Sequence, residues 1–108
     1  MINPLKIKEM LSQASEMQEE VQRKLSQTVV EGSSGGGAVT ATMNGKKQLL
    51  KINIDPSAVM SLSGSQADVE MLEDLVVAAV NEAGRKAEDA IQSSVQGALG
   101  GLKIPGLS

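Results

Sequence analysis

Apolar and small residues recur three and four positions apart at the start of this chain, while Gln, Glu and Lys fill the positions between them. This spacing predicts an amphipathic helix over residues 4–28, with a seam that continues over about three heptads. Asn3 is a suitable N-cap, and Pro4 suits the first helical position. The seam consists of Ile7, Met10, Ala14, Met17, Val21 and Thr28, with Leu11 and Leu25 beside it.

The period changes to two between residues 28 and 54. Residues 28–31 are β-prone, the Gly/Ser run at 32–37 predicts a flexible loop that interrupts any regular element, and apolar side chains alternate with Thr over 39–43. Asn44-Gly45 favours a two-residue type I′ turn before the last strand. Three short antiparallel strands with one apolar face need helices to cover them. The face positions are Val39, Ala41, Met43, Leu50, Ile52 and Ile54.

A second long helix is predicted over residues 67–98. Asp55-Pro56 ends the sheet and starts a short helical turn, and the tail at 100–108 is expected to be flexible. A helix of this length is roughly 45 Å long, against ~20 Å for a strand, so part of it must project beyond the sheet. Gly84 in its interior costs about 1 kcal/mol relative to Ala, which close packing of another backbone would offset. The seam contains Val69, Leu72, Val76, Ala79, Ala83, Ala87, Ile91 and Val95.

These elements predict an α+β fold: a single domain over residues 1–99 in the order α-β-β-β-α, with a three-stranded antiparallel sheet and two long helices. Apolar residues make up 41% of the chain, but none is aromatic. A core of aliphatic side chains is lean for a monomer of this size, so we expect an oligomer that buries more surface between copies. Candidate residues for the dimer or core seam are Met10, Met17, Val21, Leu72, Val76, Ala79 and Ala83.

The absence of His, Cys and aromatic residues excludes several functions. An ordinary zinc site, a thiolate nucleophile, a Ser-His pair and a disulfide are all impossible, and unpaired bases have no stacking platform. The acidic residues at 68–74 suit the first turns of a helix, and the glycine run lacks the Lys and helix start of a phosphate loop. We therefore expect no enzyme activity, cofactor, metal or small-molecule substrate. Without a signal or membrane segment, the protein is expected in the cytoplasm, away from membranes.

The net charge of −3 argues against nucleic acid, although local patches matter more than the total. Residues 32–67 carry three Lys and one Asp, a balance of +2. The basic doublets have two interpretations. Either they are solvated surface pairs, balanced in part by Glu19, Glu20, Glu82 and Glu88, or they contact phosphates, in which case a dimer presents two copies of each doublet. Lys46-Lys47 is the cleanest patch because no acid lies close to it in sequence. The candidates are Lys6, Lys8, Arg23, Lys24, Lys46, Lys47, Arg85 and Lys86.

Taken together, these residues resemble the YbaB/EbfC family of bacterial nucleoid-associated proteins over nearly the whole chain. The most specific piece is the run 70–76 (EMLEDLV), continued by Ala78-Ala79, Asn81, Ala83 and Lys86, in a pattern of the type EMLEDLVxAAxNDAxRK. Supporting pieces are residues 30–32, 39–45, 52–56, the N-terminal Met10, Gln13, Ala14 and 17–19, and the Pro-Gly tail.

The resemblance implies a tweezer-like homodimer, with paired helices projecting from a central sheet, that binds double-stranded DNA in the nucleoid and contributes to its organisation and to gene regulation. The chain differs from several relatives in the acidic face of its first helix and in Gly84, where relatives commonly have Ala. The alternative function is a dimeric scaffold or adaptor that binds a client protein without physiological DNA binding.

Overall fold

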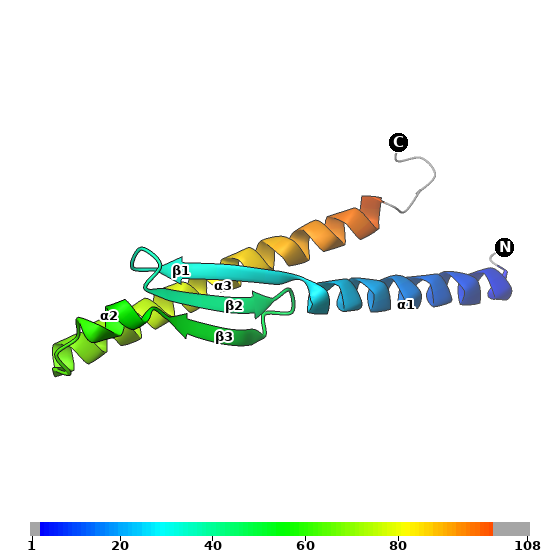
Figure 1. The fold of residues 1–108 in the computed structure, drawn as a ribbon. Helices are drawn as coiled ribbons and strands as arrows, with labels where there is room; N and C mark the ends of the chain where they lie inside the picture. Colours follow the sequence, from blue (N-terminus) through cyan, green and yellow to red (C-terminus); the bar gives the residue numbers. More distant parts are fainter. Residues whose placement is uncertain (1–2, 101–108) are drawn as a thin grey trace.

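The protein is described by a computed structural model that covers residues 3–100, with side chains up to residue 97. Its elements follow the predicted order, and the short helical turn predicted after Asp55-Pro56 is present as a five-residue helix. Of the tail predicted at 100–108, residues 101–108 lie outside the described residues, whereas Gly100 is the last residue of a helix. The elements are α1 (Pro4–Gln27), β1 (Val29–Ser34), β2 (Val39–Asn44), β3 (Leu49–Ile54), α2 (Pro56–Met60) and α3 (Gln66–Gly100) (Figure 1).

Local hydrogen bonds fix where the helices begin. The Asn3 side chain accepts a hydrogen bond from the backbone N–H of Leu5, as predicted for an N-cap. The Asp55 carboxylate caps α2 by accepting hydrogen bonds from the backbone N–H and the hydroxyl of Ser57. These two bonds lower the pKa of the Asp55 carboxyl. The backbone N–H and hydroxyl of Ser63 donate to the Asp68 carboxylate, which lowers the pKa of Asp68 and fastens the loop that precedes α3.

The three strands form an antiparallel sheet in the order β1-β2-β3. Ile52 and Ile54 pair with Ala41 and Val39, which confirms that these side chains share one face. The prediction that the Gly/Ser run starts a loop at residue 32 was wrong, since β1 continues to Ser34. The cause is tertiary: α3 covers this end of β1, and the Ser34 hydroxyl donates to the backbone carbonyl of Leu75 at 2.5 Å.

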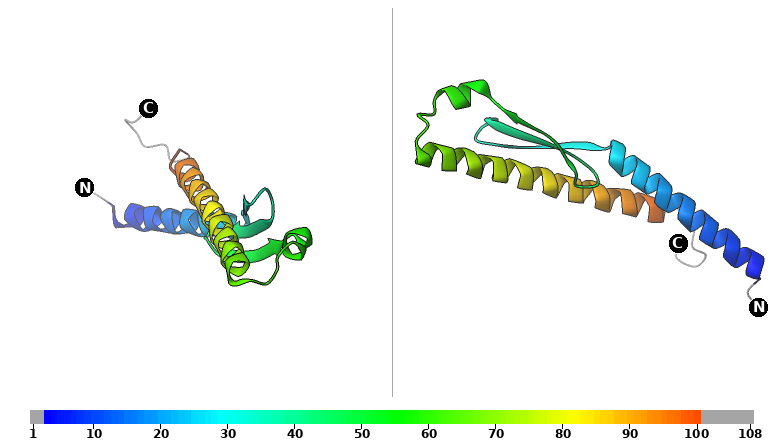
Figure 2. Two further views of the ribbon diagram at one scale, coloured as in Figure 1. Left: turned by 90° about the vertical axis from the view of Figure 1, so that its left-hand side faces the viewer. Right: turned by 90° about the horizontal axis from the view of Figure 1, so that it is seen from below.

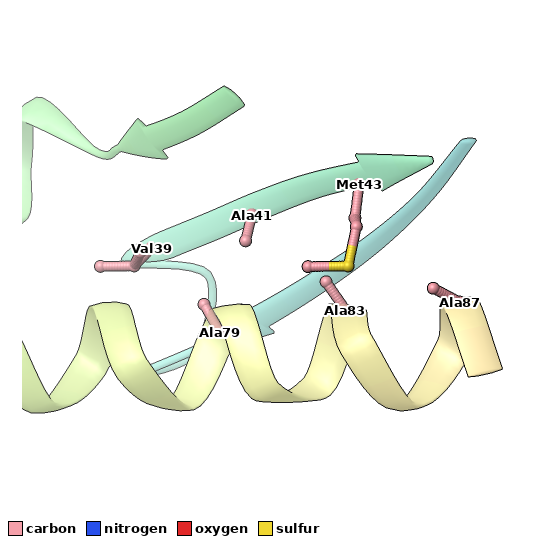
Figure 3. Packing of buried hydrophobic residues seen from close by; sticks show 6 residues of the cluster. All are labelled: Val39, Ala41, Met43, Ala79, Ala83 and Ala87. Carbon is pink, nitrogen blue, oxygen red and sulfur yellow. The ribbon is translucent and has the colours of Figure 1, made fainter. Parts of the chain in front are cut away.

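The core lies between α3 and the first two strands. Val39, Ala41 and Met43 of β2 point toward the alanine face of α3, which consists of Ala79, Ala83 and Ala87 (Figure 3). Gly32 of β1 lies against the same helix, and a Cβ there would overlap the backbone of Ala79 and Ala83. Helix and sheet therefore meet almost backbone to backbone.

Much of the remaining apolar surface is uncovered. α3 packs on β1 and β2, so Leu49 and Leu50 of β3 remain about half exposed. α1 and the C-terminal end of α3 extend past the same end of the sheet, and the molecule measures 74 × 24 × 18 Å (Figures 1 and 2). Every residue of α1 before Met17 is exposed. A chain this extended cannot bury its predicted seams by itself.

The predicted seam residues differ in how far one chain buries them. Ala79 and Ala83 are buried within the chain, and Leu72 and Val76 pack against that core. Met17 and Val21 are half-buried, whereas Met10 is 67% exposed.

Replacing Gly32 with Ala should lower the free energy of unfolding by about 3 kcal/mol, because the added methyl group must push α3 away from β1. Chemical denaturation followed by circular dichroism would measure this decrease. Gly97→Ala is the matched control, since a Cβ at that helical position meets no atom within 4 Å. Equal stability of the two variants would contradict the close contact.

Candidate nucleic-acid interface

The hairpin tip that joins β2 to β3 (residues 45–48) is built around one buried amide. Asn44 is 4% exposed, and its side-chain oxygen accepts hydrogen bonds from the backbone N–H groups of Lys46 and Gln48, each at 3.0 Å. Its amide nitrogen donates to the Gln48 side chain at 2.7 Å. The tip that carries Lys46 and Lys47 is therefore held in one conformation.

The two-residue type I′ turn predicted at Asn44-Gly45 is wrong. The backbone N–H of Lys47 donates to the Asn44 carbonyl, and that of Asn44 donates to the Gln48 carbonyl, which leaves three residues in the loop. Lys47 rather than Gly45 takes the left-handed conformation, with φ of 64°. In a non-glycine residue this costs about 1 kcal/mol.

Gly45 is required for close packing against α1 rather than for its backbone angles, which explains why the turn prediction failed. Its backbone N–H donates to the carbonyls of Leu25 at 2.9 Å and Thr28 at 3.0 Å. A Cβ at Gly45 would lie 2.7 Å from the Leu25 carbonyl oxygen. The glycine is thus needed for close approach to the end of α1, and it anchors the hairpin tip there.

Lys47 also connects the tip to α3. Its ammonium group forms an ion pair with Glu88 at 2.5 Å, with both side chains about half exposed. Lys46-Lys47 has no acid close in sequence, but the fold places Glu88, which is distant in sequence, beside Lys47. Beside this pair lies an open depression of about 570 Å³, lined by Met43, Lys47, Val80, Asn81, Gly84, Arg85 and Glu88.

The fold separates the Arg85-Lys86 doublet. Arg85 lines the depression together with Met43 of β2 and Lys47 of the hairpin tip. The Lys86 ammonium group instead donates to the Glu31 carbonyl of β1 at 2.7 Å and lies 3.4 Å from Glu82. Arg85 is thus available beside Lys47, whereas Lys86 ties α3 to β1.

The candidates on α1 lie at two distant positions. Arg23 and Lys24 occupy its last turns, next to the Leu25 carbonyl that receives the hairpin tip, and a cation there suits the helix dipole. Lys6 and Lys8 lie near its N-terminus, roughly 25 Å from Arg23 at the rise of an α-helix. The structure therefore brings one pair of α1 to the hairpin tip and leaves the other pair apart.

Sequence reasoning missed five residues of this surface as members of a site. Met43, Val80, Asn81 and Gly84 line the depression, and Glu88 binds Lys47 rather than balancing the Arg85-Lys86 doublet. No local signal could identify them, because their proximity depends on how α3 crosses the sheet.

Over residues 3–100, His, Cys, Asp and Glu do not gather into a group of three that could hold a metal ion. Among the same residues, no helix is both long and apolar enough to cross a membrane.

Comparison with known proteins identifies the relatives of this chain. The YbaB/EbfC DNA-binding family matches residues 3–102. The chain belongs to that family. It is 66% identical to a nucleoid-associated protein of Acidobacterium capsulatum over 96% of both chains. It is 51% identical to a nucleoid-associated protein of Koribacter versatilis, over 93% of this chain and 94% of that one.

Among solved structures, an uncharacterized protein of Helicobacter pylori has the same fold. Its TM-score is 0.74 at 19% identity, covering 92% of this chain and 99% of that chain. The α+β fold predicted from the sequence is thereby confirmed, as is the resemblance to the YbaB/EbfC family. Membership of this DNA-binding family also confirms the prediction that the chain is not an enzyme.

In this YbaB/EbfC chain, Lys86→Ala should lower the free energy of unfolding by about 1 kcal/mol. The variant lacks a charged hydrogen bond to Glu31 whose strength is reduced by its exposure to solvent. Arg85→Ala is the control, because Arg85 makes no such bond among the described residues and the change in helix propensity is the same. Equal unfolding midpoints in urea would contradict a structural role for Lys86.

Proposed function

We propose that the protein binds double-stranded DNA as a homodimer through contacts to phosphate groups. The observation that carries this proposal is the anchored cationic hairpin tip. Asn44 and Gly45 fix its backbone, the end of α1 brings Arg23-Lys24 beside it, and α3 brings Arg85 into the depression lined by Lys47. Three parts of the chain thus supply positive groups to one region of an acidic protein.

Phosphate contact suits these groups better than base readout. Lys and Arg side chains bind phosphate oxygens and position a protein on the duplex without carrying sequence information. The chain has no aromatic residue that could stack on a base. DNA binding of this kind is consistent with organising the nucleoid and affecting gene expression, and with location in the cytoplasm at the nucleoid. The two relatives described above are named nucleoid-associated proteins.

Homodimerisation is supported by the apolar surface that one chain leaves uncovered. Leu5, Met10 and Leu11 on α1 are 67–69% exposed, and β3 presents Leu49 and Leu50 beyond the edge of α3. A soluble monomer rarely exposes so many large aliphatic side chains on contiguous surfaces. A second copy covers them, doubles the number of hairpin tips and gives the projecting helices α1 and α3 the partner required by a tweezer-like arrangement.

The alternative function as a protein scaffold is favoured by one observation at the opposite end of the molecule. Met60 is 85% exposed, and Val59 and Met71 are about half exposed near the α2–α3 connection. Docking of a client on such apolar groups persists or strengthens in salt, whereas phosphate binding weakens.

Reversing the charge of the hairpin tip should weaken duplex binding at least tenfold at low salt. Lys46→Glu with Lys47→Glu removes two cations per protomer that would neutralise phosphates. The salt slope should therefore become shallower by about 0.9 for each phosphate that is no longer neutralised. Fluorescence anisotropy with a labelled 30-base-pair duplex measures both quantities.

The matched control makes the same charge change far from the tip, in Lys6→Glu with Lys8→Glu. A smaller decrease in affinity in this control would locate the phosphate-binding surface at the tip. An equal decrease in both double variants would refute the tip assignment and leave only long-range charge.

Sedimentation should give a mass of about 22 kDa, twice the 11.2 kDa of the chain. Met10→Lys combined with Leu50→Lys should shift the protein toward monomer, because both substitutions place charge on the proposed apolar interface. Met60→Lys is the control and should leave the dimer intact. A wild-type monomer at micromolar concentration would refute the homodimer.

A further inference from the structure

The floor of the depression beside the hairpin tip includes a glycine, Gly84. At Gly84 the helix α3 carries no side chain, and a Cβ built there would meet no atom within 4 Å. No contact within the described part of the chain therefore requires glycine, although glycine weakens the interior of a helix. The bare backbone leaves room for a group from another molecule to approach α3 closely.

The rim of the depression carries the groups that an anion would need. Lys47 and Arg85 supply cations, and Asn81 supplies an amide. The Lys47 ammonium group is occupied by the carboxylate of Glu88, and both side chains are about half exposed. An ion pair as exposed as this one contributes little to stability, so a competing anion can exchange with it.

We propose that this depression is a seat for the sugar–phosphate backbone of DNA, with Glu88 as an internal competitor. A phosphate replaces the Glu88 carboxylate on Lys47 and also contacts Arg85, while the space above Gly84 admits the backbone. Glu88 then sets the affinity, because it must release Lys47 and afterwards lies near the bound phosphate. This inference rests on the proposed DNA binding and names the surface that performs it.

A DNA backbone fits the depression better than a second copy of the chain. Its rim has two cations against one carboxylate, and its apolar floor is confined to Met43 and Val80. The exposed seam of α1 needs a long apolar strip as a partner, and this depression does not offer one.

The first test removes the competitor. Glu88→Gln frees Lys47 and should tighten duplex binding about threefold or more at low salt, measured by anisotropy with the same 30-base-pair duplex. Glu73→Gln makes the same change in net charge on α3 but lies outside the lining of the depression, so its effect should be smaller. Equal effects of the two variants would overturn the role of Glu88.

The second test fills the floor. Gly84→Ala should raise the unfolding temperature by about 4 °C, because Ala favours the helix, and yet weaken duplex binding about threefold or more. Gly97→Ala also adds a methyl group to α3 where it meets no atom, so it should leave DNA affinity unchanged.

Three outcomes separate the hypotheses. Opposite changes in stability and affinity for Gly84→Ala, with an unchanged sedimentation profile, support the seat. Unchanged DNA affinity of Gly84→Ala would overturn the proposed site. Dissociation of the dimer would also overturn it, and would assign the space above Gly84 to a second copy of the chain. Failure of the wild-type protein to bind the duplex at low salt would instead reject the proposed function itself.

Discussion

The close contact between the alanine face of α3 and Gly32 of β1 determines where the other elements lie. Ala79 and Ala83 present only methyl groups to the sheet, and Gly32 presents none, so the helix rests almost on the strand backbone. This contact buries little side-chain volume, but it lets a chain without aromatic residues close a core. It also centres α3 over β1 and β2, which leaves β3 with its apolar side chains half covered.

The position of α3 then fixes the cationic surface. With the helix in place, Glu88 lies within reach of Lys47, and Arg85 lies on the same side of α3 as the hairpin. The Gly45 contact with Leu25 adds the end of α1 from the other direction. Two glycines, one under α3 and one against α1, therefore set the geometry of a surface whose chemistry comes from Lys and Arg.

Sequence patterns identified the elements of this fold because helices and strands are specified by local periodicity. The seam of α3 and the alternation along β2 each continue through several turns or positions, so single exceptions do not hide them. The same patterns did not show what an apolar seam packs against. Ala79 and Ala83 pack on the sheet of their own chain, whereas Met10 remains exposed, although both lie on seams with the same helical spacing.

The errors at the hairpin have a related cause. Asn44-Gly45 is a strong turn signal, but the signal assumes that glycine is present for its backbone angles. Here Gly45 is present for its lack of a side chain, and Lys47 takes the left-handed conformation instead. The Lys47–Glu88 pair joins residues 41 positions apart and depends on the crossing of α3, so no local pattern reports it.

The acidic net charge is reconciled with DNA binding by where the charges lie. Residues 52–84 contain no Lys or Arg, and the acids of this stretch include Asp68, Glu70, Glu73 and Asp74 in the N-terminal half of α3. Asp74 lies roughly 17 Å along the helix from Arg85. That distance is about two Debye lengths at physiological ionic strength, so the acidic half of α3 is screened from a phosphate at the hairpin tip. In the DNA complex that we propose, the same charges favour an orientation in which the α2 end points away from the duplex.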